Sequence, residues 1–134
     1  MFPRTGLTVT VHLLQDDGSV GGAALTAVGL ALLDNGISIS APFCGVEVCQ
    51  VDDKLVLDAD AKTQARAQAK WLFAFTRTAD GDAEMVASDS VGPFKMDTFA
   101  SALSLARMGA QQIFTFYKEM MERKLSVDVF PKLE

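Results

Sequence analysis

Apolar and polar residues alternate near the start of the chain. Leucine or valine occupies every second position of residues 7–13, and Thr8, Thr10 and His12 lie between them. A period of two is typical of a strand that turns one face to the core. The pattern therefore predicts the first strand over residues 7–13.

A glycine-rich turn at residues 18–22 ends this alternation, and the apolar positions that follow recur at helical spacing. Small residues are frequent here, so a second element can approach closely. The sequence Asp34-Asn35-Gly36 supplies a helix stop. We expect a helix from about Gly21 to Leu33 and interpret Asp16-Asp17-Gly18 as an acidic turn that caps it.

Two hairpins are predicted next, because short β-rich runs flank residues that favour turns. The expected strands are 43–51 and 54–58 around a turn at 52–53, and 71–76 and 84–90 around a turn at 79–82. Between the hairpins, residues 61–70 are ambiguous. Their composition favours a helix, yet the strand at Trp71 can extend back into them.

The last predicted element is a long helix with an apolar stripe at spacings of three and four from Phe99 to Met121. Asp97 is the expected N-cap, and Lys118, Arg123 and Lys124 complement the dipole at the other end. Residues 127–134 read as a loose tail after a single domain over residues 1–126.

The predicted order is β-α-β-β-β-β-α, which is an α+β domain with an antiparallel sheet covered by two helices. Residues 2–5 run directly from Met1 into the first predicted core strand, without a capping segment. This suggests a chain that begins in the middle of something larger.

Composition limits the function classes. The chain has 134 residues, 49% of them hydrophobic, which is enough for one compact core. Twelve basic against 17 acidic residues give a net charge of -5, so the chain lacks the charge of an independent nucleic-acid binder. Any RNA contact must be local or shared with basic partners. No secretory signal or membrane span is visible, and we expect a soluble, intracellular protein.

Cys44 and Cys49 lie five positions apart in one predicted strand. An odd spacing places them on opposite faces, which argues against a mutual disulfide and favours reduced, buried thiols. His12 is the single histidine, so a zinc site has little support. On a polar strand face His12 is a surface or interface residue more often than a catalytic base.

Several segments, in this order, resemble the C-terminal half of RNase PH family proteins. They are Phe2-Pro3-Arg4-Thr5, the Gly18 turn into the Ala-rich helix, Asp34-Asn35-Gly36-Ile37, Phe43-Cys44-Gly45-Val46, Leu55-Val56-Leu57-Asp58 and residues 112–119. The resemblance covers essentially the whole chain but only about half of a family member. It implies half of an RNase PH-like fold and a place in the six-membered RNase PH-type ring of the RNA exosome.

The resemblance also identifies an altered site. Active members bind phosphate through an arginine at a helix N-terminus and a metal through two aspartates, which together support phosphoryl transfer. The matching positions here are Gly21, Gln64 and Lys70. A lysine repels Mg²⁺, which prefers carboxylate oxygens. The resemblance therefore implies a non-catalytic subunit with no cofactor, which supports 3'-5' RNA degradation and processing.

The implied partners are other RNase PH-type exosome subunits, cap proteins and RNA. A homodimer of the isolated half, which would bury the face left uncovered, is a further possibility. The implied location is the nucleus with its nucleolus, and the cytoplasm.

Two interpretations compete with this one or add to it. Asp58 and Asp60 share a face if they lie in one strand, so the alternative is a Mg²⁺-dependent ribonuclease, phosphorolytic or hydrolytic, that uses this pair. The RNA-binding candidates are Arg4, Lys62, Arg66 and Lys70, of which the last three form a basic stripe if helical. The aromatic residues of strand 71–76 can stack bases, but packing beneath the last helix is favoured.

Overall fold

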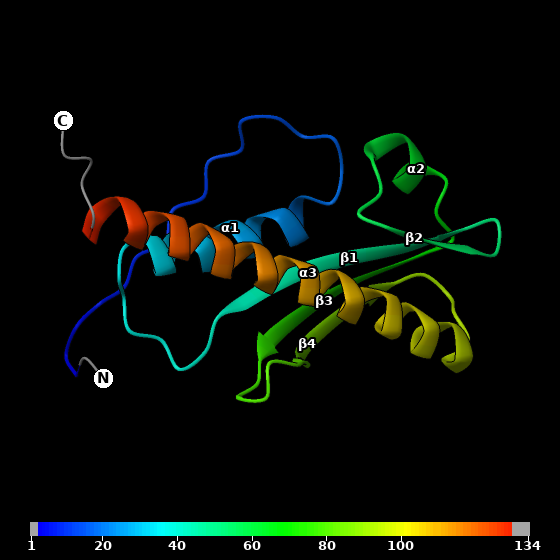
Figure 1. Ribbon diagram of the computed structural model, residues 1–134. Helices are drawn as coiled ribbons and strands as arrows, with labels where there is room; N and C mark the ends of the chain where they lie inside the picture. Colours follow the sequence, from blue (N-terminus) through cyan, green and yellow to red (C-terminus); the bar gives the residue numbers. More distant parts are fainter. Residues whose placement is uncertain (1–2, 130–134) are drawn as a thin grey trace.

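The computed structural model describes residues 3–129 of the protein. Its helices and strands follow the chain in the order α-β-β-α-β-β-α (Figure 1). They are α1 (Val20–Asp34), β1 (Phe43–Val51), β2 (Lys54–Leu57), α2 (Ala61–Ala65), β3 (Ala69–Arg77), β4 (Ala83–Val91) and α3 (Met96–Val129).

The four strands form one antiparallel sheet in the order β2-β1-β3-β4. Both predicted hairpins are confirmed. Asp52 and Asp53 join β1 to β2 with φ angles of 50° and 63°, the left-handed conformation that a tight two-residue hairpin turn requires. The ambiguous segment 61–70 divides, because α2 is followed at Ala69 by β3.

One face of the sheet packs against α3 and holds the hydrophobic core. Trp71, Phe73 and Phe75 of β3 expose 1% or less of their surface, and alternate residues of β1 lie beside them. Helix α3 presents fully buried alanines at spacings of four to this face, namely Ala102, Ala106 and Ala110. Small side chains on the helix let it approach the large aromatic residues closely, so the predicted core packing of the aromatic strand is confirmed.

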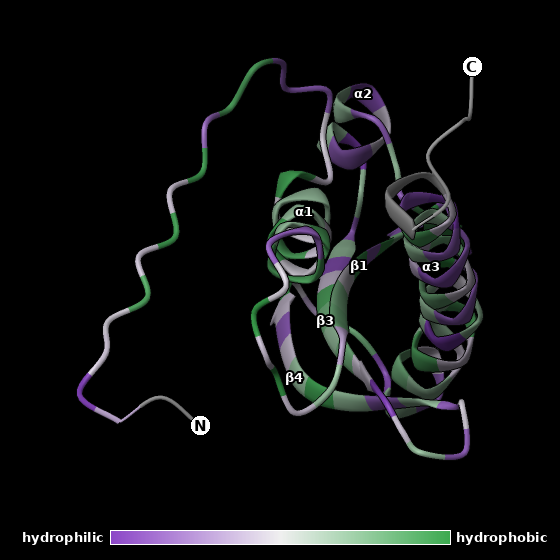
Figure 2. Cartoon of the chain, turned by 60° about the vertical axis from the view of Figure 1, so that its left-hand side comes forward, coloured by the Kyte–Doolittle hydropathy of each residue, from purple (hydrophilic) through white to green (hydrophobic). Residues whose placement is uncertain are grey.

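Helix α1 lies across β1 from α3 (Figure 2). Gly45 of β1 makes the close approach possible, since a Cβ atom there would lie 2.7 Å from Cβ of Leu25. Thr26 of α1 accepts a hydrogen bond at Oγ1 from the Gly45 N–H at 3.3 Å. Small residues in both elements therefore set the distance between α1 and the sheet.

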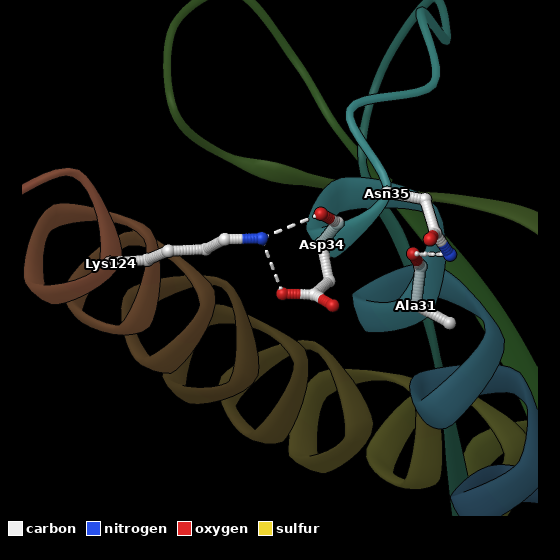
Figure 3. A network of polar contacts seen from close by, with 4 residues as sticks. All are labelled: Ala31, Asp34, Asn35 and Lys124. Carbon is white, nitrogen blue, oxygen red and sulfur yellow. Dashed lines mark hydrogen bonds and ion pairs between the residues drawn. The ribbon is translucent and has the colours of Figure 1, made fainter. Parts of the chain in front are cut away.

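Two side chains of α3 reach α1. The Tyr117 hydroxyl lies 2.7 Å from the carbonyl oxygen of Thr26 and 3.1 Å from that of Phe43. Lys124 donates to the backbone carbonyl and to the carboxylate of Asp34, both at 2.7 Å (Figure 3). Lys124 was expected to complement the dipole of its own helix, but it lies at the C-terminal end of α1 instead.

The first predicted strand is wrong. Residues 7–13 belong to no strand of the described chain, and every residue from 4 to 17 is exposed. Figure 2 shows them as an extended segment that stands apart from the sheet, with hydrophobic and polar positions alternating along it. Alternation indicates a strand with one buried face, but no strand within residues 3–129 pairs with residues 7–13. The α+β class with an antiparallel sheet holds without it.

The ends of α3 also differ from expectation. Asp97 lies inside the first turn instead of capping it, because the helix begins at Met96. The helix continues through Val129, so the tail predicted from residue 127 does not begin there, and residues 130–134 lie outside the described part. No helix within residues 3–129 is long and apolar enough to cross a membrane.

Candidate functional site

The three positions at which the sequence departs from the RNase PH pattern meet in one cleft. Gly21 of α1, Gln64 of α2 and Lys70 of β3 all line a hollow of about 350 Å³. Glu47 and Cys49 of β1 form its floor with Lys70. The structure therefore brings together residues that are up to 49 positions apart in the sequence.

The turn into α1 forms one wall of this cleft. Gly18 has a φ of +86°, and a Cβ atom there would lie 2.7–2.9 Å from backbone atoms of residues 59–61. Only glycine fits this place. Asp16 accepts a hydrogen bond from the Gly18 N–H at 2.9 Å, which closes the turn. Asp16 thus shapes the turn, and Ser19, the N-cap of α1, makes no side-chain cap.

Gln64 connects α2 to the rest of the site. Its Nε2 atom lies 3.1 Å from Oγ of Ser19 and 3.1 Å from Oε2 of Glu47. The Ser19 hydroxyl, which is buried, donates in turn to the carbonyl oxygen of Ala59 at 2.8 Å. The amide of Gln64 is therefore engaged within the protein, and it holds the short helix α2 against the first turn of α1.

Glu47 is the site residue that the sequence analysis missed. A Cβ atom on Gly21 would lie 2.9 Å from Oε1 of Glu47, so this carboxylate lies against the first turn of α1. The N-terminal end of a helix attracts negative charge, which stabilises an anion there. Glu47 is the one charged residue of the strand Phe43–Val51, and that is the signal that could have identified it.

Lys70 lies opposite Cys49 in the register of β1 and β3, on the sheet face that carries Glu47. Burial raises the pKa of the Cys49 thiol; the positive charge of Lys70 opposes this shift and the negative charge of Glu47 reinforces it. Cys44 points to the opposite face, and both cysteines are free, as their spacing predicted.

The predicted pair of Asp58 and Asp60 does not form a shared strand face, since β2 ends at Leu57. Asp58 has a left-handed φ of 54°. Asp60 is the N-cap of α2, and its Oδ1 accepts a hydrogen bond from the Thr63 N–H at 2.8 Å. Hydrogen bonding from the side chain of Thr63, and then from its backbone, lowers the pKa of the Asp60 carboxyl group. Within residues 3–129, no cluster of three or more His, Cys, Asp or Glu side chains is placed to hold a metal ion.

The predicted basic stripe is wrong as a helical feature. Lys62 lies in α2 and Arg66 is its C-cap, whereas Lys70 lies in β3. Both Lys62 and Arg66 lower the pKa of Asp60 by their charge, so they are near its carboxylate. Arg4 lies in a turn before the extended segment, with a left-handed φ of 59°. All four candidate RNA-binding residues are exposed.

Comparison with known proteins identifies the class to which this arrangement corresponds. No family model matches the chain. It is 44% identical over 128 residues to the exosome complex component RRP46 homolog of Caenorhabditis elegans, covering 96% of this chain and 60% of that protein. It is 31% identical over 125 residues to the exosome complex component Rrp41 of Archaeoglobus fulgidus, covering 92% of this chain and 48% of that protein.

Solved structures agree. The crystal structure of C. elegans cell-death-related nuclease 5 (CRN-5) superposes with a TM-score of 0.83 at 43% identity, covering 90% of this chain and 65% of that one. Rice (Oryza sativa) Rrp46 gives a TM-score of 0.74 at 16% identity over 81% of this chain and 51% of that one, a likeness of fold alone.

The chain is therefore similar to exosome components of the RNase PH type, and the resemblance found in the sequence is confirmed. The particular proteins that this chain resembles are Rrp46 and Rrp41. The chain spans about half to 60% of the length of these curated relatives, and its fold is half of an RNase PH-like fold.

Proposed function

We propose that the chain is a non-catalytic subunit of an RNase PH-type exosome ring and supports 3'-5' degradation and processing of RNA by binding neighbouring subunits and RNA. The observation that carries the non-catalytic part is Glu47, whose carboxylate lies against Gly21. In the active members of the family, the phosphate-binding arginine stands at the position of Gly21.

Electrostatics gives the reason. Two unit charges about 4 Å apart interact by roughly 4 kcal/mol at an effective dielectric constant of about 20. A phosphate at the first turn of α1 would meet the negative charge of Glu47 with no arginine at Gly21 to offset it. Gln64 supplies a neutral amide and Lys70 a cation where the family's metal ligands would stand, so a divalent cation is disfavoured as well.

The direct test is an RNA degradation assay. The protein, incubated with single-stranded RNA and Mg²⁺, should release no nucleoside diphosphates when phosphate is present and no shortened RNA when phosphate is absent. Cleavage that disappears in Asp58→Asn or Asp60→Asn would overturn the proposal and favour the alternative of a Mg²⁺-dependent ribonuclease that uses these residues.

A binding experiment tests the part assigned to Glu47. Gly21→Arg restores the arginine, and Gly21→Arg with Glu47→Gln also removes the charge while keeping an oxygen that can accept from Gln64. Titration with inorganic phosphate should show affinity at least several-fold higher for the double variant than for Gly21→Arg alone. Equal affinities would show that Glu47 does not block the site.

RNA contact is proposed for the exposed basic residues, principally Lys62 in α2 and Arg66 at its C-terminal end, with Arg4 and Lys70. The Lys62→Ala/Arg66→Ala variant should bind single-stranded RNA more weakly and with a shallower salt dependence than the wild type. Lys118→Ala/Arg123→Ala removes the same charge from the exposed surface of α3 and serves as the control. An equal loss in both variants would show only a general effect of charge.

The proposed partners are other RNase PH-type exosome subunits and cap proteins, and the proposed location is the nucleus, with the nucleolus, and the cytoplasm. Affinity purification with mass spectrometry and fluorescence imaging of the tagged chain test these points. If the purified chain carries no exosome subunit with it, the proposed partners are contradicted. For the isolated chain we also propose a homodimer.

A further inference from the structure

The side chain of Gln64 joins three separate elements of the candidate site. Its Nε2 atom donates to Oγ of Ser19, the N-cap of α1, and to Oε2 of Glu47 in β1, both at 3.1 Å. The Ser19 hydroxyl donates in turn to the carbonyl oxygen of Ala59, just before α2, at 2.8 Å. One amide group therefore ties α2 to residues that lie 17 and 45 positions away in the sequence.

The two partners fix which end of the amide faces them. The Ser19 hydroxyl uses its hydrogen on Ala59, so toward Gln64 it can only accept. The carboxylate of Glu47 is an acceptor as well. Nε2 carries two hydrogens, one for each of these oxygens, whereas the amide oxygen in its place would face two acceptors. The amide of Gln64 therefore matches both partners as a donor.

Helix α2 depends on such bonds because it has no buried residue of its own. It is five residues long, and none of the five is buried. A helix this short gains little from propensity or from apolar burial, so hydrogen bonds to neighbouring elements decide where it lies. Ser19, one of the two partners, exposes only 4% of its surface, so the bond from Gln64 anchors α2 to the protein interior.

The same atoms show whether the metal ion of the family's active members fits this place. Mg²⁺ takes oxygen ligands in an octahedron at about 2.0–2.1 Å, in which neighbouring oxygens lie about 3 Å apart. Oγ of Ser19 and Oε2 of Glu47 each lie 3.1 Å from the amide nitrogen of Gln64. A nitrogen that carries two hydrogens has no lone pair for a cation, and Lys70 adds a positive charge to the same cleft. The residues present do not fit a metal ion.

We propose that the Gln64 amide takes the structural place of that cation, as a metal-independent cross-link that holds α2 and the Glu47 carboxylate against the first turn of α1. A cation draws oxygens together by its charge. The two N–H groups of Gln64 do so by hydrogen bonds, of which the one to Glu47 has a charged acceptor. The role assigned to Gln64 rests on the proposed non-catalytic function, and it keeps the site in shape whether or not divalent cations are present.

The first test is hydrogen exchange in α2. Gln64→Ala removes both bonds of the amide and should speed exchange of the backbone N–H groups of Arg66 and Ala67, which close the end of α2, at least several-fold. The matched control is Gln111→Ala, because Nε2 of Gln111 also donates to a carboxylate, that of Asp82, at 2.8 Å. The control should leave exchange in α2 unchanged. Unchanged exchange in Gln64→Ala would overturn the cross-link.

The second test converts the amide into a carboxylate of the same shape. In Gln64→Glu an oxygen replaces Nε2 beside Oε2 of Glu47, so the two carboxylates repel each other unless a cation lies between them. The exposed Lys70 lines the same cleft and could supply that positive charge. The substitution is therefore made in a Lys70→Gln background, and thermal unfolding is measured with EDTA and with millimolar Mg²⁺.

The proposal sets the response of each protein to Mg²⁺. The wild type and Lys70→Gln should unfold at the same temperature in both conditions. Lys70→Gln/Gln64→Glu should unfold at a lower temperature in EDTA and gain several degrees with Mg²⁺. Lys70→Gln/Gln111→Glu, which sets a carboxylate beside Asp82 on the exposed surface, should respond less. A Mg²⁺ response without Gln64→Glu, or none with it, would overturn the proposal.

These measurements contain no RNA, so they separate the cross-link from the proposed function. Degradation of RNA by the wild type would contradict the non-catalytic function even if exchange and unfolding follow the pattern expected for Gln64. Failure of either test on Gln64 would overturn the cross-link and leave the non-catalytic function to its own assay.

Discussion

β3 and the segment of residues 7–13 carry the same sequence pattern and have opposite fates. Trp71, Phe73 and Phe75 alternate with smaller or polar residues and expose at most 1% of their surface. The leucines and valines of residues 7–13 alternate with polar residues just as regularly, and they expose 49–62%. The two regions share the alternation of large apolar side chains and differ in their neighbours.

The comparison shows what alternation specifies. It fixes an extended backbone and places alternate side chains on one face, because both follow from the geometry of a single strand. It does not supply a partner. β3 has β1 and β4 beside it and α3 over one face, whereas the described residues beside positions 7–12 belong to α1 and the loop that follows it.

The largest expected effect comes from the buried region. Phe73→Ala should lower the free energy of unfolding by about 3–5 kcal/mol, because it leaves a cavity where Phe73 packs on Phe75 and Phe99. Chemical denaturation monitored by circular dichroism measures this. A loss below about 1 kcal/mol would mean that β3 is not the core strand described here.

The dependence of folding stability on pH is expected to show an intermediate effect, which also comes from the buried region. Burial raises the pKa of the Cys44 thiol to about 12. In the unfolded chain this thiol has its ordinary pKa near 9, so above pH 9 the unfolded chain loses the proton while the folded chain keeps it. The contribution of Cys44 to the free energy of unfolding is therefore fully present below pH 9 and decreases as the pH rises toward 12. The slope from this group is at most about 1.4 kcal/mol per pH unit.

Denaturation between pH 8 and pH 11 should therefore show a shallower decline for Cys44→Ala than for the wild type. Val46→Ala, which also shortens a buried residue of β1, should keep the wild-type slope and serves as the control. Identical slopes in all three proteins would contradict a buried, protonated thiol at Cys44.

The smallest effect is expected in the exposed segment. Leu13→Ser, measured in dilute solution where the chain is monomeric, should change the free energy of unfolding by no more than about 0.5 kcal/mol. The side chain is 62% exposed, so little apolar burial is lost. A loss similar to that of Phe73→Ala would remove the contrast between the two regions.

In the candidate site, too, some residues could be identified from the sequence and others only from their neighbours in the structure. The resemblance to RNase PH proteins identified Gly21, Gln64 and Lys70, and the structure places all three around one cleft. Glu47 was missed because its importance depends on its distance from Gly21, which lies 26 positions earlier in the sequence. The pairing of Asp58 with Asp60 was wrong because β2 ends before them and α2 uses Asp60 as its N-cap.

The sequence by itself determined the two hairpins, α1, α3 and the faces of Cys44 and Cys49, since turn residues and periodicity act over a few positions. The tertiary structure alone decided that residues 7–13 lie outside the sheet and that Lys124 meets the end of α1. It also placed the Glu47 carboxylate at the first turn of α1. These features depend on contacts between distant segments, and local patterns carry no information about which segment comes to lie beside another.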